Sequence, residues 1–290
     1  MFVQFLINGL ITGVLYSLLA IGFALVYNTT RVFHIAAAAL YVFAAFMFYF
    51  FSVGGPGLPL VFAGGVSLLL TAGLSLLMDV SVYRPLERRG ADGNVSMIAS
   101  IAMMTVVVNL MVMLFGSEMK SVMTSSSRIY AFPWGQLATP QLVQLMVGGT
   151  VLVLSILVLA FSRWGLRLKA LSGNGTLYEM LGRDNRAARS RIFLASGLFI
   201  ALSACLSAYD QGLDAYMGMD MLVNAMVAMI LGGVGRYGAC VVGGLTLGVV
   251  QSLVVGSFSS HWEGAITFAL LLVLLFLRPQ GIAGYKERRI

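Results

Sequence analysis

The stretch that decides the fold class is "ILGGVGRYGACVVGG", residues 230–244. Within it, Gly233, Gly235 and Gly238 have the G-x-G-x-x-G spacing of a turn that holds a dinucleotide phosphate. That interpretation requires a strand before the turn and a helix after it, in a soluble βαβ unit. Long apolar runs flank this stretch instead. We therefore predict a tight turn between two closely packed membrane helices, and no nucleotide site.

The composition of the whole chain is that of a polytopic membrane protein. Hydrophobic residues make up 59% of the 290 residues and charged residues only 10%, with a mean hydropathy of +0.93. Soluble domains have about 25% charged residues. Cys205 and Cys240 lie in or beside apolar runs, so we predict buried free thiols. With two histidines and no Cys/His cluster, we expect no metal and no cofactor.

Apolar segments long enough to cross a bilayer recur along the chain, because a helix needs about 20 apolar residues to do so. We predict an all-α bundle of about 8–9 transmembrane helices in one domain, residues 1–290. The segment at 222–234 is short, which indicates a broken or re-entrant helix. Asn8-Gly9 and Gly13 leave open whether the first segment is one helix or two. The predicted spans are 3–27, 33–53, 58–79, 95–116, 141–162, 192–209, 222–234, 239–257 and 262–277.

The distribution of Lys and Arg predicts the orientation. If the N-terminus lies outside and the C-terminus in the cytoplasm, only Lys120 and Arg128 of the 18 basic residues lie outside. The net charge of +7 is then explained by topology and by contact with the lipid bilayer, and we expect no nucleic-acid partner.

The span interiors contain neutral polar groups and no central charge. Ion-coupled carriers usually place carboxylates or histidines there, so we infer that energy for transport enters from outside the membrane domain. The scarce carboxylates show no catalytic grouping, and we predict that the protein is not an enzyme. The residues expected to line a solute path are Asn8, Thr12, Tyr16, Asn109 and Asn224.

A cytoplasmic segment at 163–191, "RWGLRLKALSGNGTLYEMLGRDNRAARSR", is the longest predicted on that side. Thr176 and Glu179 have the spacing of a capping box, and Gly182 suits the end of a helix. A helix this short is unstable alone and needs a partner surface. It lies on lipid or docks into another subunit, and the residues it would present are Leu177, Tyr178, Met180 and Leu181.

Glycines four residues apart mark predicted helix contacts. Gly9 and Gly13 form one such pair, and Gly244 and Gly248 form another. Small residues at this spacing let helices approach closely in lipid. We assign the same packing role to the glycines of the predicted turn, Gly232, Gly233, Gly235 and Gly238.

Four stretches carry a resemblance to a known family. They are "NGLITGVLYSLLAIGFALVYN", "EMLGRDNRAARSRIFLASG", "NAMVAMILGGVGRYGACVVGGLTLGVVQSL" and "FLRPQGIAG". Together they resemble the permeases of branched-chain amino acid ABC importers, most closely the LivH-type subunit, and the resemblance runs over most of the chain.

The resemblance implies a multi-pass permease of the bacterial inner membrane that moves branched-chain or other hydrophobic amino acids by alternating access. Its implied partners are a second permease, identical or paralogous, two cytoplasmic ATPase subunits and a periplasmic solute-binding protein. Residues 176–182 would form the coupling helix, and 116–140 with 210–220 would receive the binding protein. Urea, short amides or another small solute is the alternative cargo. An ATP-independent channel or facilitator is the alternative mechanism.

Overall fold

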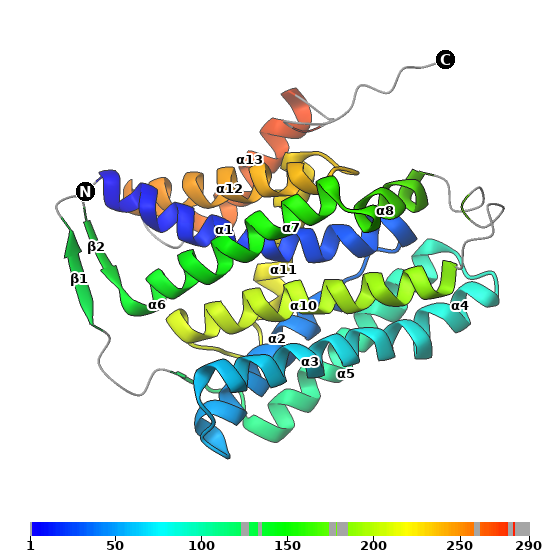
Figure 1. The fold of residues 1–290 in the computed structure, drawn as a ribbon, viewed down its shortest axis with the longest axis horizontal. Helices are drawn as coiled ribbons and strands as arrows, with labels where there is room; N and C mark the ends of the chain where they lie inside the picture. The colour runs from blue at the N-terminus through cyan, green and yellow to red at the C-terminus, as the bar shows by residue number, and fades with distance from the viewer. Residues whose placement is uncertain are drawn as a thin grey trace.

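The fold is a bundle of helices with one small hairpin at one end (Figure 1). It comes from a computed structural model, which describes residues 2–122, 128–132, 135–173, 178, 185–257, 262–277 and 281.

The α-helices carry most of the chain, as predicted. Three π-helical turns continue or join them: η1 (Phe50–Gly54) after α2, η2 (Asp79–Tyr83) between α3 and α4, and η3 (Gln144–Gly148) between α6 and α7. The helices described are α1 (Phe2–Thr30), α2 (Ala37–Tyr49), α3 (Leu60–Met78), α4 (Arg84–Arg88), α5 (Gly93–Phe115), α6 (Thr139–Val143), α7 (Gly149–Phe161), α8 (Arg163–Gly173), α10 (Asn185–Gln211), α11 (Met217–Gly232), α12 (Tyr237–Ser257) and α13 (Glu263–Leu277).

The helices that the structure places at the predicted spans differ in length. Within the described residues, seven continuous helical stretches are long and apolar enough to cross a membrane, while α11 and α13 are shorter. The 16 residues of α11 extend about 24 Å, less than a hydrocarbon core of about 30 Å. α11 is mostly buried among its neighbours. The prediction of a short helix in this region agrees with the structure.

α1 forms the centre of the bundle and α5 its edge. In the most apolar part of α1, 89% of the residues are buried, whereas in the most apolar part of α5 only 11% are buried. α1 is one continuous helix, so Asn8-Gly9 does not divide it into two. It packs against α12, α10 and α11. An apolar face that stays exposed, as on α5, is suited to lipid.

The two ends of the bundle differ. The N-terminus lies beside a hairpin of β1 (Ile129–Phe132) and β2 (Gly135–Ala138) (Figure 1), where Gln4 Nε2 donates to the carbonyl of Gln136 at 2.8 Å. α4 and α8 lie at the opposite end. The all-α prediction missed this hairpin because its strands have only four residues each and come directly before a long apolar segment.

Close backbone contact between α1 and α12 depends on glycine. A Cβ on Gly9 would lie 2.7 Å from the Cα of Val249, and one on Gly13 would lie 2.9 Å from the Cα of Leu245. A Cβ on Gly244 would meet the backbone of Ser17, and one on Gly248 would meet the backbone of Gly13. These distances leave no room for a side chain, so the two helices touch through their backbones.

The turn that opened the sequence analysis joins α11 to α12. Gly233 has φ +118° and Gly235 has φ +96°, which favour glycine. A Cβ on Gly232 would overlap the carbonyl of Ala239, so this glycine packs helix to helix. Helices flank the turn on both sides, with no βαβ unit around it among residues 185–257.

The packing role predicted for Gly238 is wrong. Among the described residues, a Cβ on Gly238 would meet no heavy atom within 4 Å, because Gly238 faces open space in the first turn of α12. Gly235 likewise has open space around it and serves the turn through its backbone conformation.

Candidate functional site

A cavity of about 680 Å³ lies among α1, α11, α12 and α13. One stripe of α1 supplies Phe5, Asn8, Thr12 and Tyr16. These positions are three or four residues apart and so share one face of the helix. We call this cavity the polar pocket. Its lining is completed by Gln211, Asp220, Met221, Val223, Asn224, Gly248, Gln251, Ser252, Val255, Gly264, Thr267 and Phe268.

A network of neutral polar side chains from four helices forms one wall of the polar pocket. Asn224 Nδ2 donates to the Tyr16 hydroxyl at 3.2 Å, and Gln251 Nε2 donates to Asn224 Oδ1 at 3.1 Å. Thr267 Oγ1 also donates to Asn224 Oδ1, at 3.3 Å, and Gln251 Nε2 hydrogen-bonds to Thr267. All four residues are buried. Such a network fixes the side-chain positions on that wall.

The structure brings together four of the five predicted path residues. Asn8, Thr12, Tyr16 and Asn224 all line the polar pocket. Asn109 does not: it is exposed on α5, where its Nδ2 donates to the Thr105 carbonyl at 2.8 Å. Asn109 lies away from this pocket because α5 is at the edge of the bundle and packs mainly on α2, so its place on a solute path stays a prediction.

Two residues of the network, Gln251 and Thr267, were not among the predicted path residues. Gln251 lies in the middle of an apolar segment, which is the same signal that indicated Asn224. Thr267 lies in α13 and gives no such signal, since threonine is common inside membrane helices.

The polar pocket is nearly free of charge. Asp220, exposed in the first turn of α11, is the one charged residue among those that line it. Amide and hydroxyl groups supply the other polar contacts. A pocket of this kind can hydrogen-bond a neutral or zwitterionic solute, and its single carboxylate favours positive over negative groups.

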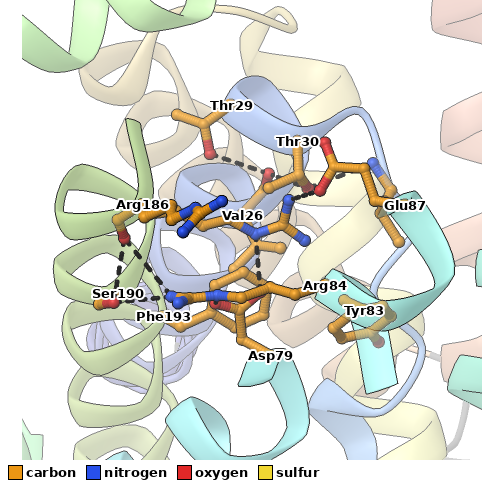
Figure 2. Close-up of polar contacts among 12 residues, drawn as sticks. Val26, Thr29, Thr30, Asp79, Tyr83, Arg84, Glu87, Arg186, Ser190 and Phe193 are labelled. Carbon is orange, nitrogen blue, oxygen red and sulfur yellow. Dashed lines mark hydrogen bonds and ion pairs between the residues drawn. The ribbon is translucent and has the colours of Figure 1, made fainter. Parts of the chain in front are cut away.

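An ion-pair cluster lies at the end of the bundle opposite the N-terminus. The Asp79 side chain is fully buried in η2, and its Oδ2 lies 2.7 Å from Arg84 Nε (Figure 2). Its other oxygen, Oδ1, lies 2.6 Å from Nε of Arg189 on α10. Arg189 also pairs with Glu87. A buried carboxylate needs such partners, because an unpaired charge there is costly.

The same cluster connects α4 to the first turns of α10. Arg84 Nη2 donates to Ser190 Oγ at 2.7 Å and to the Arg186 carbonyl at 3.4 Å (Figure 2). The sequence alone could not reveal these contacts, since Asp79 and Arg189 are 110 positions apart.

The predicted coupling helix lies almost entirely outside the described residues. Of its members only Tyr178 is described, as helical and buried. It lines a cavity of about 220 Å³ between α8 and α10, with Trp164 and Arg191. The prediction for this helix stands untested; the members outside the description are Thr176, Leu177, Glu179, Met180, Leu181 and Gly182.

His34 is packed in the protein interior and does not line the polar pocket. It is fully buried in the connection between α1 and α2, and its Nδ1 lies 2.7 Å from the Tyr83 hydroxyl. That hydroxyl donates to Ser100 Oγ at 2.9 Å. Burial lowers the pKa of His34 to about 3, so the imidazole is neutral at physiological pH.

Apolar helices around a neutral polar pocket, with paired arginines at one end, define a multi-pass membrane protein of the transport class. Its family follows from comparison: residues 5–275 match the family described as branched-chain amino acid transport system / permease component. The chain belongs to this family of permeases.

Two curated relatives match over nearly the full length. The chain is 25% identical to the high-affinity branched-chain amino acid transport system permease protein BraD of Pseudomonas aeruginosa, over 99% of this chain and 97% of BraD. It is 23% identical to the LivH permease of the corresponding system in Escherichia coli K12, over 99% of this chain and 96% of LivH.

The fold also resembles a solved structure, that of PsaBC from Streptococcus pneumoniae in complex with Fab. The TM-score is 0.53 at 15% sequence identity, over 95% of this chain and 92% of that chain. This likeness concerns the fold alone.

Proposed function

We propose that the chain is the transmembrane permease of an ATP-binding-cassette importer, and that the polar pocket is part of its solute path. The observation that carries the proposal is the gathering of Asn8, Thr12, Tyr16 and Asn224 around one cavity. The cargo is a branched-chain or other hydrophobic amino acid. A zwitterion of this kind suits a pocket with many amide and hydroxyl groups and little charge.

The proposed assembly contains a second permease, two cytoplasmic ATPase subunits and a periplasmic solute-binding protein, in a bacterial inner membrane. The N-terminus lies outside and the C-terminus inside. The cluster of Arg84, Arg186 and Arg189 at the end opposite the N-terminus supports this orientation.

Alternating access requires that a movement of the ATPase subunits is transmitted to the helices that line the solute path. α10 follows the predicted coupling segment directly and is tied to η2 through Arg189 and Asp79. Further along α10, Ser203 Oγ donates to the carbonyl of Leu15 at 3.0 Å. Leu15 precedes Tyr16, which lines the polar pocket. A displacement of α10 therefore has a contiguous route to α1 and the pocket.

A cysteine substitution at Thr12 tests whether the polar pocket is on the path. Cys205 and Cys240 are buried, which keeps the background labelling low. We expect a membrane-impermeant thiol reagent added outside to label Thr12→Cys, and the rate to change when the ATPase is trapped with nucleotide. Asn109→Cys is the control, because a thiol on a lipid-facing helix stays protonated and unreactive.

Two results would count against the proposal. If Thr12→Cys resists the reagent in every nucleotide state, the polar pocket is not on the path. If the labelling rate of Thr12→Cys is the same with and without nucleotide, and uptake continues after ATP depletion, the protein is a channel or facilitator.

A further inference from the structure

The side chain of Gln251, a residue that lines the polar pocket, has an unused hydrogen-bond acceptor. Gln251 lies in α12 and is only 3% exposed. Its Nε2 is engaged with Asn224 and Thr267, but its Oε1 has no hydrogen-bond partner among the described residues. Leaving a buried polar atom unpaired costs about 1–3 kcal/mol. Gln251 itself lines the polar pocket of about 680 Å³, so a group that enters this pocket is the nearest partner available to its unpaired oxygen.

We infer that Gln251 Oε1 accepts a hydrogen bond from an N–H group of the transported solute, a primary ammonium or an amide, and so positions that solute in the pocket. This inference rests on the proposed function, in which the polar pocket is part of the solute path. It makes Gln251 a specificity-determining residue.

The direction of the hydrogen bonds in the network leaves an acceptor of Gln251, and not a donor, free to bind the solute. Asn224 Nδ2 is directed to the Tyr16 hydroxyl, which leaves Asn224 Oδ1 facing α12 and α13. Gln251 turns its Nε2 toward Asn224 Oδ1, at 3.1 Å. The carbonyl end of the Gln251 amide is then the end left for a ligand.

The charge around the pocket favours the same class of solute. The lining residues that the structure describes include the carboxylate of Asp220 and no lysine, arginine or histidine. An anionic solute would meet this carboxylate and the Gln251 carbonyl oxygen with no cation to offset them. A solute that offers N–H groups is attracted by both. One hydrogen bond of this kind is worth about tenfold in apparent affinity.

Protection of a pocket cysteine measures the preference directly. We would use full-length permease carrying Thr12→Cys, co-purified with its ATPase in lipid nanodiscs, and follow the thiol labelling rate. The probes are L-leucine and its N,N,N-trimethyl derivative, which has the same charges but no N–H donor. Acetamide and N,N-dimethylacetamide form an uncharged second pair. With Gln251 present, the N–H member of each pair should protect at about tenfold lower concentration.

Substitutions at Gln251 separate this preference from differences in probe size. Gln251→Met keeps the length of the side chain but lacks the acceptor, so the preference for N–H probes should fall to the part that size alone explains. Gln251→Glu keeps an acceptor and should keep the preference. Thr246→Val is the control, since Thr246 is half-buried on α12, is not among the residues that line the polar pocket, and donates its hydroxyl to the Val242 carbonyl. An unchanged labelling rate without probe shows that each variant is folded.

The two ways to fail differ in their result. If Gln251→Met retains the full preference while the probes still protect Thr12→Cys, Gln251 does not select the solute, but the pocket remains on the path. If neither probe pair protects Thr12→Cys even with Gln251 in place, the proposed solute path is wrong and the inference falls with it.

Discussion

Arg189 on α10 holds the buried carboxylate of Asp79 with its Nε 2.6 Å from Oδ1. The pair joins the helix that follows the predicted coupling segment to the end of α3. Arg84 holds the other oxygen of the same carboxylate. Three segments of the chain thus meet at one negative charge.

Asp79→Asn should destabilise the protein and weaken coupling. The substitution removes the carboxylate that the largely buried Arg84 and Arg189 share, and only Arg189 keeps a second partner, Glu87. We expect this loss to lower the free energy of unfolding by about 2–4 kcal/mol. Thermal unfolding in detergent measures this. Glu87→Gln is the control, because Glu87 is 66% exposed and its pair with Arg189 should contribute less than about 1 kcal/mol. Equal losses of unfolding free energy in the two variants would contradict the view that the buried Asp79 pairs matter more than the exposed Glu87 pair.

Gly248→Ala and Gly238→Ala should have opposite effects on stability. The new Cβ at Gly248 would meet the backbone of Gly13, forcing α1 and α12 apart at about 1–3 kcal/mol. At Gly238 the new Cβ meets open space, and alanine should stabilise the helix by about 0.5–1 kcal/mol. Unfolding temperatures of the two variants in one detergent test this. A stabilised Gly248→Ala would show that the helix contact is loose.

Burial of His34 should make stability fall at acid pH. The pKa of His34 is lowered from 6.5 to about 3 by desolvation, so between these values the unfolded chain binds a proton that the folded protein does not. The free energy of unfolding should therefore decrease as pH falls below 6.5, by up to about 1.4 kcal/mol per pH unit from this residue. His34→Gln should show a shallower decrease in unfolding temperature between pH 6.5 and 5. Parallel curves would rule out His34 as a source of the pH dependence.

Met180→Asp tests the coupling helix predicted from the sequence. A carboxylate on the apolar face of a docking helix should abolish stimulation of the ATPase by the permease, while membrane insertion stays normal. ATP hydrolysis by the reconstituted complex is the measurement. Ala170→Asp on the exposed face of α8 adds the same charge outside the predicted helix and should leave stimulation intact. Full stimulation in Met180→Asp would mean that this helix lies on lipid.

The sequence was sufficient to find one wall of the polar pocket. Asn8, Thr12 and Tyr16 share a helix face by their spacing alone, and Asn224 is a polar residue in an apolar segment. Asn109 gives the same signal as Asn224 but lies on the outer face of α5. Polarity in a span does not reveal which side of the helix meets the bundle, because the spans have apolar residues on every face.

Contacts between segments far apart in the chain could not be predicted from the sequence. The Asp79–Arg189 pair depends on the packing of α3 against α10, and the Gln251 network depends on where α11 and α13 meet α12. Neither arrangement follows from local residue preferences. The hairpin of β1 and β2 was missed for a different reason, since strands of four residues carry little periodic signal.

The backbone contact between α1 and α12 has a mechanical consequence. With no side chains between them at Gly9, Gly13, Gly244 and Gly248, the two helices cannot slide past each other or separate without exposing peptide groups to hydrocarbon. We therefore expect α1 and α12 to move together as one unit. α13 is short, and among the described residues its main contacts are with α11 and α12. We therefore expect the polar pocket to widen or narrow mainly through movement of α13 relative to α1 and α12, which move together.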